Sequence, residues 1–357
     1  MRNVGTRAAG VTIACILVAA MAILFQARIR SLFPLGNDLE PSGDDWWTYH
    51  RYAVSVVHDG LSMPAVEGAY TRPGGFGYVY FVAACYAVFG VRSEVVYVIQ
   101  AALLALAVIG FVVAFGRGLL YGLLLVVFVY LDAFRFYTFR LLSENLLIVL
   151  LAALFIALDR LLSKRSWLAA AVAGVLCGAC FLTRPNTVLL APAWALLLIW
   201  QKRDRRAIEQ GLILLAGLVA MASLIVWRDY AAAGSLDLRV LTTTQDWPRP
   251  SAALYGKRIL YVLGDLRALV PEFGALRHWY AAWAGVLLLL VQIVRRRQAD
   301  PLDQAALVFL AAYYGPLIAV ADITNYGIRM LVPAMPVVLY LGVRGVTVTL
   351  DSRKMHS

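Results

Sequence analysis

Ten long apolar runs follow one another along the chain, and they restrict its fold more than any other feature of the sequence. They begin near Val11, Val95, Leu119, Leu146, Trp167, Val188, Gly211, Ala281, Ala305 and Leu331. Since a helix needs roughly 20 apolar residues to cross a bilayer, the longer runs predict spanning helices and the shorter ones must recruit flanking polar or aromatic residues. Hydrophobic residues make up 62% of the 357 residues and charged residues 15%, against about 45–50% and about 25% in soluble domains. The chain is therefore predicted to be an all-α polytopic membrane protein, with residues 1–357 forming a single integral-membrane domain.

The basic residues predict the orientation of these helices. With the N-terminus in the cytoplasm and ten crossings, the basic clusters at residues 160–165, 202–206, 295–297 and 353–354 all fall inside, as the positive-inside rule requires. A further apolar run, Phe76 to Phe89, would move all four clusters outside if it also crossed. We therefore predict a re-entrant or interfacial helix there. The net charge of +11 is explained by topology, so no nucleic-acid partner is expected.

Two long outer segments follow from this topology, residues 27–94 and residues 228–280. Both are rich in Trp, Tyr and Arg, unlike passive linkers. We expect the chemistry of the protein at this outer membrane surface.

Cys177 and Cys180 form a C-x-x-C motif beside Gly174 and Gly178. A thiol pair or metal site is one interpretation. The GxxxG spacing favours the other, in which small side chains let two helices approach closely.

The first outer segment carries the most informative polar cluster. The apolar spacing from Trp46 to Val57 predicts an amphipathic interfacial helix that ends at Gly60. Asp44 and Asp45 then fall in its first turn, where one carboxylate suffices to cap the helix. The other would be available as a general base or as a ligand of a divalent cation.

Further polar residues lie where outer helix ends are expected, and together they predict a site for a phosphate and a nucleophile. Each also has a structural interpretation: an arginine can extend its charge to the interface, Glu144 can cap its helix, and the aromatic residues can form an interfacial belt. Ionisable groups near the hydrocarbon are nevertheless candidates for function. The predicted substrate-binding residues are Arg72, Glu144, Arg184, Arg329, Tyr49 and Trp46.

Several motifs, in their order and spacing, resemble those of GT-C fold integral-membrane glycosyltransferases. The resemblance is to the type that includes protein O-mannosyltransferases and lipid A aminoarabinose transferases, the glycosyltransferase family 39-like enzymes. The motifs are Gly43-Asp-Asp-Trp-Trp-Thr-Tyr49, Arg72-Pro-Gly-Gly-Phe-Gly-Tyr78, Gln100-Ala-Ala-Leu-Leu104, Leu142-Ser-Glu-Asn-Leu146, the stretch from Gly174 to Asn186, and Arg329-Met-Leu-Val-Pro-Ala-Met-Pro336. The chain is short for such enzymes, and Arg72-Pro-Gly-Gly75 stands where they have a double proline.

The resemblance implies a GT-C-like bundle of about ten transmembrane helices with interfacial helices in the first outer loop. It implies sugar transfer from a polyprenyl-phosphate donor to a cell-envelope acceptor (lipid, glycan or protein) at the outer face of the bacterial inner membrane, with inversion at the anomeric carbon. An Asp four residues before a Tyr and eight before an Ala matches Asp45 as catalytic base, with Asp44 as second choice. Arg184 and Arg329 match the basic positions of the family.

Two other function classes remain as alternatives. A transporter or flippase for lipid-linked sugars would carry ionisable residues near the bilayer midplane and paired broken helices, and neither pattern is seen. A polymerase for lipid-linked sugars differs only in whether the donor carries one sugar or a long glycan. The sequence predicts no particular cofactor, and the need for a divalent cation is left open.

Overall fold

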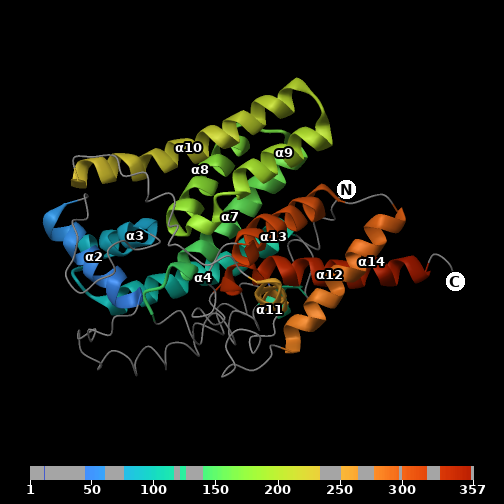
Figure 1. The fold of residues 1–357 in the computed structure, drawn as a ribbon, viewed down its shortest axis with the longest axis horizontal. Helices are drawn as coiled ribbons and strands as arrows, with labels where there is room; N and C mark the ends of the chain where they lie inside the picture. Colours follow the sequence, from blue (N-terminus) through green and yellow to red (C-terminus); the bar gives the residue numbers. More distant parts are fainter. Residues whose placement is uncertain are drawn as a thin grey trace.

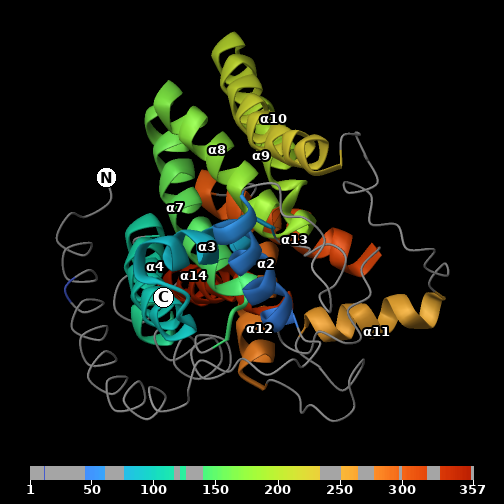
Figure 2. The same cartoon turned by 90° about the vertical axis from the view of Figure 1, so that its left-hand side faces the viewer.

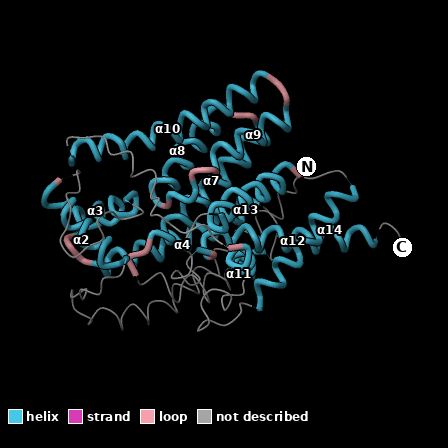
Figure 3. Tube along the Cα trace, viewed as in Figure 1, coloured by secondary structure: helices cyan, strands magenta, loops and turns pink. Residues whose placement is uncertain are grey.

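A computed structural model describes residues 12, 45–60, 76–115, 121–125, 140–233, 251–263, 277–296, 300–319 and 330–354. Within these ranges the chain is helical and contains no strand, as Figure 3 shows. The all-α prediction is confirmed.

Helices occur at the predicted spans wherever the structure describes them. The elements are α2 (Asp45–Asp59), α3 (Phe76–Phe89), α4 (Ser93–Phe115), α7 (Ser143–Lys164), α8 (Trp167–Thr183), η2 (Pro185–Thr187), α9 (Leu190–Lys202), α10 (Arg205–Ala233), α11 (Ala252–Val262), α12 (Arg277–Arg296), α13 (Pro301–Ala319), η6 (Val332–Ala334) and α14 (Met335–Lys354). The spans predicted near Val11 and Leu119 fall mainly outside the described residues.

Five of the described helices are long and apolar enough to cross a membrane. They are Ser93–Phe115, Ser143–Lys164, Arg205–Arg228, Pro301–Ala319 and Val332–Asp351. Phe76–Phe89, Trp167–Thr183 and Tyr280–Val294 are apolar but shorter. Large apolar side chains remain exposed on these helices, for example Leu106, Leu168 and Leu287, as expected of surfaces that face lipid.

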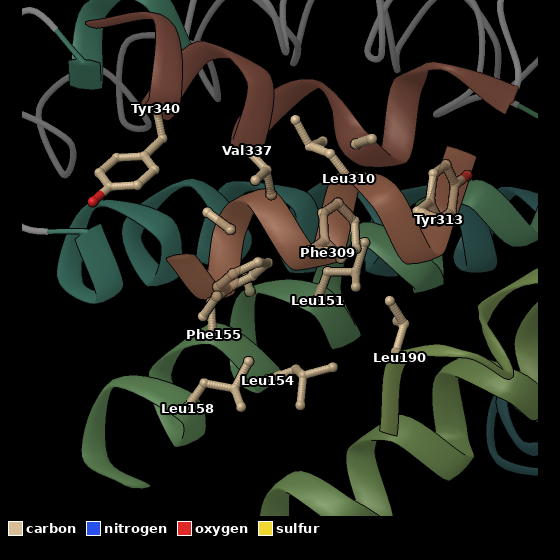
Figure 4. Packing of buried hydrophobic residues seen from close by; sticks show 14 of the residues in the cluster. Leu151, Leu154, Phe155, Leu158, Leu190, Phe309, Leu310, Tyr313, Val337 and Tyr340 are labelled. Atoms are coloured by element: carbon tan, nitrogen blue, oxygen red, sulfur yellow. The ribbon is translucent and has the colours of Figure 1, made fainter. Parts of the chain in front are cut away.

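The helices α7, α8, α9 and α10 lie side by side (Figures 1 and 2). Helix α8 packs against both α7 and α10, α4 packs against α7, and α12 packs against α14. The main core is built from side chains of α4, α7, α8, α9, α13 and α14. Within it Phe155 of α7 meets Phe309 of α13, with ring centroids 5.5 Å apart (Figure 4). Trp194 of α9 closes this aromatic group, and its indole N–H donates to the carbonyl of Ala305 at 3.0 Å.

Small residues set the spacing of α8 and α10. A Cβ atom at Gly174 would lie 2.5 Å from the carbonyl oxygen of Leu214, and one at Gly217 would lie 2.6 Å from the Gly174 carbonyl carbon. Cys177 and Cys180 are buried in α8 and are not in a disulfide. The close-packing interpretation of this motif is confirmed.

The two predicted helices of the first outer segment are confirmed. Helix α2 runs from Asp45 to Asp59 and stops at Gly60, whose φ of +95° suits a residue without a Cβ. Helix α3 has the predicted bounds Phe76–Phe89 and packs on α2. Its 14 residues are fewer than the roughly 20 that a crossing needs, and its interfacial or re-entrant position stays a prediction.

Two of the predicted basic clusters lie together at one end of the bundle, which we call the basic end. Arg165, which follows α7, pairs with Asp204, which precedes α10, at 2.5 Å. Hydrogen bonding to Arg165 lowers the pKa of the Asp204 carboxyl, and the Ala207 backbone N–H adds to this effect. The grouping agrees with the positive-inside prediction for these two loops.

Candidate functional site

The start of α7 brings a carboxylate into the protein interior at the end opposite the basic end. Ser143, Glu144 and Asn145 are all buried in the first turn of this helix, and the side chain of Glu144 is fully buried. No side chain caps the helix at Leu142. Glu144 does not take the N-cap position, and a purely capping role does not explain its burial.

Arg184 meets Glu144 from the end of α8. Because a helical conformation is disfavoured before proline, the Arg184–Pro185 sequence ends α8, and Arg184 has the extended dihedral angles φ −148° and ψ 109°. Its guanidinium donates to a Glu144 carboxylate oxygen and lies 3.4 Å from the Met330 sulfur. The side chain of Arg184 is only 12% exposed and that of Glu144 0%. The two residues form a largely buried ion pair.

Tyr49 of α2 is the third member of the site. Its hydroxyl donates to Ser143 Oγ at 3.3 Å, and Ser143 Oγ in turn lies 3.5 Å from a Glu144 carboxylate oxygen. Burial raises the pKa of Tyr49 to about 12; Arg184 opposes this shift, whereas the negative charges of Asp45 and Glu144 add to it. The phenol is thus uncharged at neutral pH and lies within electrostatic reach of both carboxylates and the guanidinium.

Asp45 and Trp46 lie in the first turn of α2, and both are partly buried. Asp45 precedes Tyr49 by one helical turn, so the two residues share a helix face. The structure thus brings Asp45, Tyr49, Glu144 and Arg184 together. The other predicted site residues, Asp44, Arg72 and Arg329, lie outside the described residues.

Some residues of the site were not predicted from the sequence. Ser143 links Tyr49 to Glu144, Met330 contacts Arg184, and the Tyr313 hydroxyl of α13 donates to the Met330 carbonyl at 3.2 Å. Tyr313 sits within an apolar run, and nothing in its local sequence distinguishes it.

Arg228, near the end of α10, is a second buried arginine close to this region. Its guanidinium lies 4.3 Å above the ring centroid of Phe76, and the side chain is 7% exposed. Phe76 is followed by Gly77, which touches the backbone of Leu182, two residues before Arg184. Arg228 is a charged residue near the end of an apolar helix, and this pattern alone could have identified it as a candidate site residue.

The described residues hold no group of three or more His, Cys, Asp or Glu side chains arranged to bind a metal ion. Asp44, the alternative to Asp45 as a base or cation ligand, is not among the described residues.

Residues 73–227 match the model of a protein family described as dolichyl-phosphate-mannose-protein mannosyltransferase. Comparison with curated proteins and with solved structures gives no significant match. The matched segment covers α3 to α9 and most of α10, and it includes Glu144 and Arg184. The match confirms the resemblance to integral-membrane glycosyltransferases over this segment.

Proposed function

We propose that this chain, whose residues 73–227 match a mannosyltransferase family, transfers a sugar from a polyprenyl-phosphate donor to a cell-envelope lipid, glycan or protein. Transfer takes place at the outer face of the bacterial inner membrane, in a site completed by the outer segments 27–94 and 228–280. The observation that carries the proposal is the buried Glu144–Arg184 pair beside Tyr49, one helical turn from Asp45.

Asp45 acts as the general base in this proposal, with Asp44 as the second candidate. The acceptor hydroxyl attacks the anomeric carbon and gives its proton to the aspartate, while the bond from that carbon to the phosphate oxygen breaks. The displacement inverts the anomeric configuration. A positioned base of this kind contributes on the order of 10²–10⁴ in rate.

Arg184 binds the departing phosphate. A guanidinium has five N–H donors in one plane, so an arginine that donates to a carboxylate can also donate to a phosphate. The interaction is stronger in a site from which water is largely excluded, and Arg184 is 12% exposed. Arg72 and Arg329 are proposed to add positive charge, and Trp46 and Tyr49 to line the sugar site.

The proposal is tested with purified protein in lipid nanodiscs and polyprenyl-phosphate mannose as donor. Released polyprenyl phosphate is measured by mass spectrometry, in the presence of acceptor lipids extracted from a deletion strain. Asp45→Asn is expected to reduce release by about 10²-fold or more. Asp59→Asn, at the exposed last turn of the same helix, is the matched control and is expected to keep wild-type activity.

Full activity in both Asp45→Asn and Asp44→Asn would overturn the assignment of the base. Movement of a lipid-linked sugar across vesicles of purified protein, without a new glycosidic bond, would instead support the transporter alternative. The mannosyltransferase match favours the enzyme.

A further inference from the structure

A pocket of about 550 Å³ opens between the last turns of α4 and α7 and the start of α13. It is unrelated to the Glu144–Arg184 pair. Glu144 lies in the first turn of α7 and Lys164 ends the helix, so at about 1.5 Å per residue the two lie about 30 Å apart, close to the thickness of the hydrocarbon core. The pocket therefore lies at the opposite membrane boundary, at the basic end.

Charges of both signs line this pocket. Arg160 and Lys164 lie one turn apart on α7, and Asp159 adjoins them. Asp300 faces the same pocket from the start of α13, where its carboxylate accepts from the Leu302 backbone N–H at 2.9 Å. The pocket thus presents two cationic and two anionic side chains. A ligand that itself carries a negative and a positive group can interact with both kinds.

Apart from Ser163, the rest of the lining is apolar. Val113 of α4, Ile156 of α7 and Leu302 of α13 contribute to it, and all three helices are candidate membrane spans. A ligand with a charged head and a hydrocarbon tail could place its head among the four charged residues and its tail along these helices. The volume lies within the range of about 300–1,000 Å³ that is usual for small-molecule sites.

We propose that this pocket binds the headgroup of a phospholipid that carries a phosphate and a primary ammonium, as phosphatidylethanolamine does. Arg160 and Lys164 hold the phosphate, in the way that basic pockets between spanning helices hold lipid headgroups. Asp159 and Asp300 accept hydrogen bonds from the ammonium, which has three N–H donors. Phosphatidylcholine has no such donor, and phosphatidylglycerol has no cation.

The test is the binding of lipids with identical acyl chains to delipidated protein in detergent. Bound lipid is counted by native mass spectrometry, and the melting temperature is followed by tryptophan fluorescence. Phosphatidylethanolamine is expected to bind at least about tenfold more tightly than phosphatidylcholine or phosphatidylglycerol, and to raise the melting temperature as a ligand of the folded state does. Equal binding of the three lipids would overturn the proposal.

Two variants locate the binding within this pocket. Arg160→Gln combined with Lys164→Gln changes two exposed side chains and is expected to weaken phosphatidylethanolamine binding by at least about tenfold. Arg205→Gln is the control, because Arg205 is 92% exposed and is not part of the pocket lining. Asp159→Asn is expected to weaken the binding of phosphatidylethanolamine and to strengthen the binding of phosphatidylglycerol. Unchanged lipid preference in both pocket variants would overturn the proposal, and the readout does not depend on transferase activity.

Discussion

The Arg184 side chain is largely buried, so an unpaired charge at this position would be costly. It forms a buried ion pair with Glu144, and taking two charges out of water costs several kcal/mol per ion, which their mutual attraction at best offsets. The main role of the pair is therefore to position the Arg184 guanidinium, and its net contribution to stability is small.

Replacing one member of this pair should destabilise the protein strongly. Arg184→Gln leaves the carboxylate of Glu144 buried without its cation, and the free energy of unfolding is expected to fall by about 3–5 kcal/mol. Arg205→Gln breaks the exposed pair with Glu209 and should cost less than about 0.5 kcal/mol. Denaturant titration of both variants in the same detergent measures the difference.

The double variant Glu144→Gln with Arg184→Gln completes this cycle. Because both charges are removed, its loss is expected to be smaller than the sum of the single losses. Additive losses would contradict the ion pair.

His50 should make stability depend on pH. Burial lowers its pKa from 6.5 to about 4, and the positive charge of Arg51 adds to the effect. Its Nδ1 lies 2.8 Å from the Tyr86 hydroxyl, a contact in which the neutral ring can accept. The unfolded chain protonates this histidine more readily than the folded chain does. The stabilisation that comes from the neutral His50 ring is therefore present above pH 6.5 and is lost as the pH falls from 6.5 to about 4.

Melting temperatures measured from pH 7.5 to pH 4 check this expectation. His50→Gln should show a shallower decline than the wild type. His58→Gln, at the exposed end of the same helix, should follow the wild type. If all three curves coincide, His50 carries no such effect.

The sequence predicted the site residues in part. Motif position and expected depth placed Glu144 and Arg184 at the same outer surface, and the structure pairs them. Ser143, Tyr313 and Met330 were not predicted, because depth along a helix follows from the sequence whereas the rotation of each helix about its axis depends on packing. Met330 follows Arg329, a predicted substrate-binding residue. Its contact with Arg184 joins residues far apart in the chain, which the local sequence does not reveal.

At the level of helices, α8 and α10 pack with their backbones in direct contact at Gly174 and Gly217. Gly174→Ala would place a methyl group 2.5 Å from the Leu214 carbonyl oxygen and should lower the free energy of unfolding by about 1–3 kcal/mol, because the backbones must separate. Gly315→Ala in α13 is the control, since a Cβ there meets no atom within 4 Å. Thermal unfolding of the two variants distinguishes them, and an equal loss would mean that the α8–α10 contact is not responsible.

Helix positions were predicted well wherever apolar runs were long. The bounds differ where polar residues belong to the helix: α10 starts at Arg205, before the predicted Gly211, because its first turns project Arg205 and Glu209 toward solvent. Helix α9 starts at Leu190, after the turn that Pro185 imposes. Helix α11 was not predicted, since its 11 residues include Lys257 and Arg258 and form no apolar run.

For the whole molecule, the two ends should be reached from opposite sides of the membrane. A cysteine at exposed His58 lies in the first outer segment, and one at exposed Arg205 lies at the basic end. A membrane-impermeant thiol reagent applied to spheroplasts should label His58→Cys at once, but Arg205→Cys only after permeabilisation. Cys85, Cys177 and Cys180 are buried, and labelling of the parent protein provides the background.

The reverse pattern would invert the predicted orientation and place the candidate site in the cytoplasm. Equal labelling of both positions in spheroplasts would contradict the separation of the two ends.

The contact between Gly77 and Leu182 also has an evolutionary consequence. A Cβ at position 77 would lie 2.9–3.0 Å from backbone atoms of Leu182, so even a methyl group would press on the turn of α8 that leads into Arg184. Lineages that retain this ion pair should therefore keep glycine at position 77, whereas lineages that have lost the pair should be free to vary it. If this constraint holds, residues 77, 144 and 184 should be kept or lost together in related sequences.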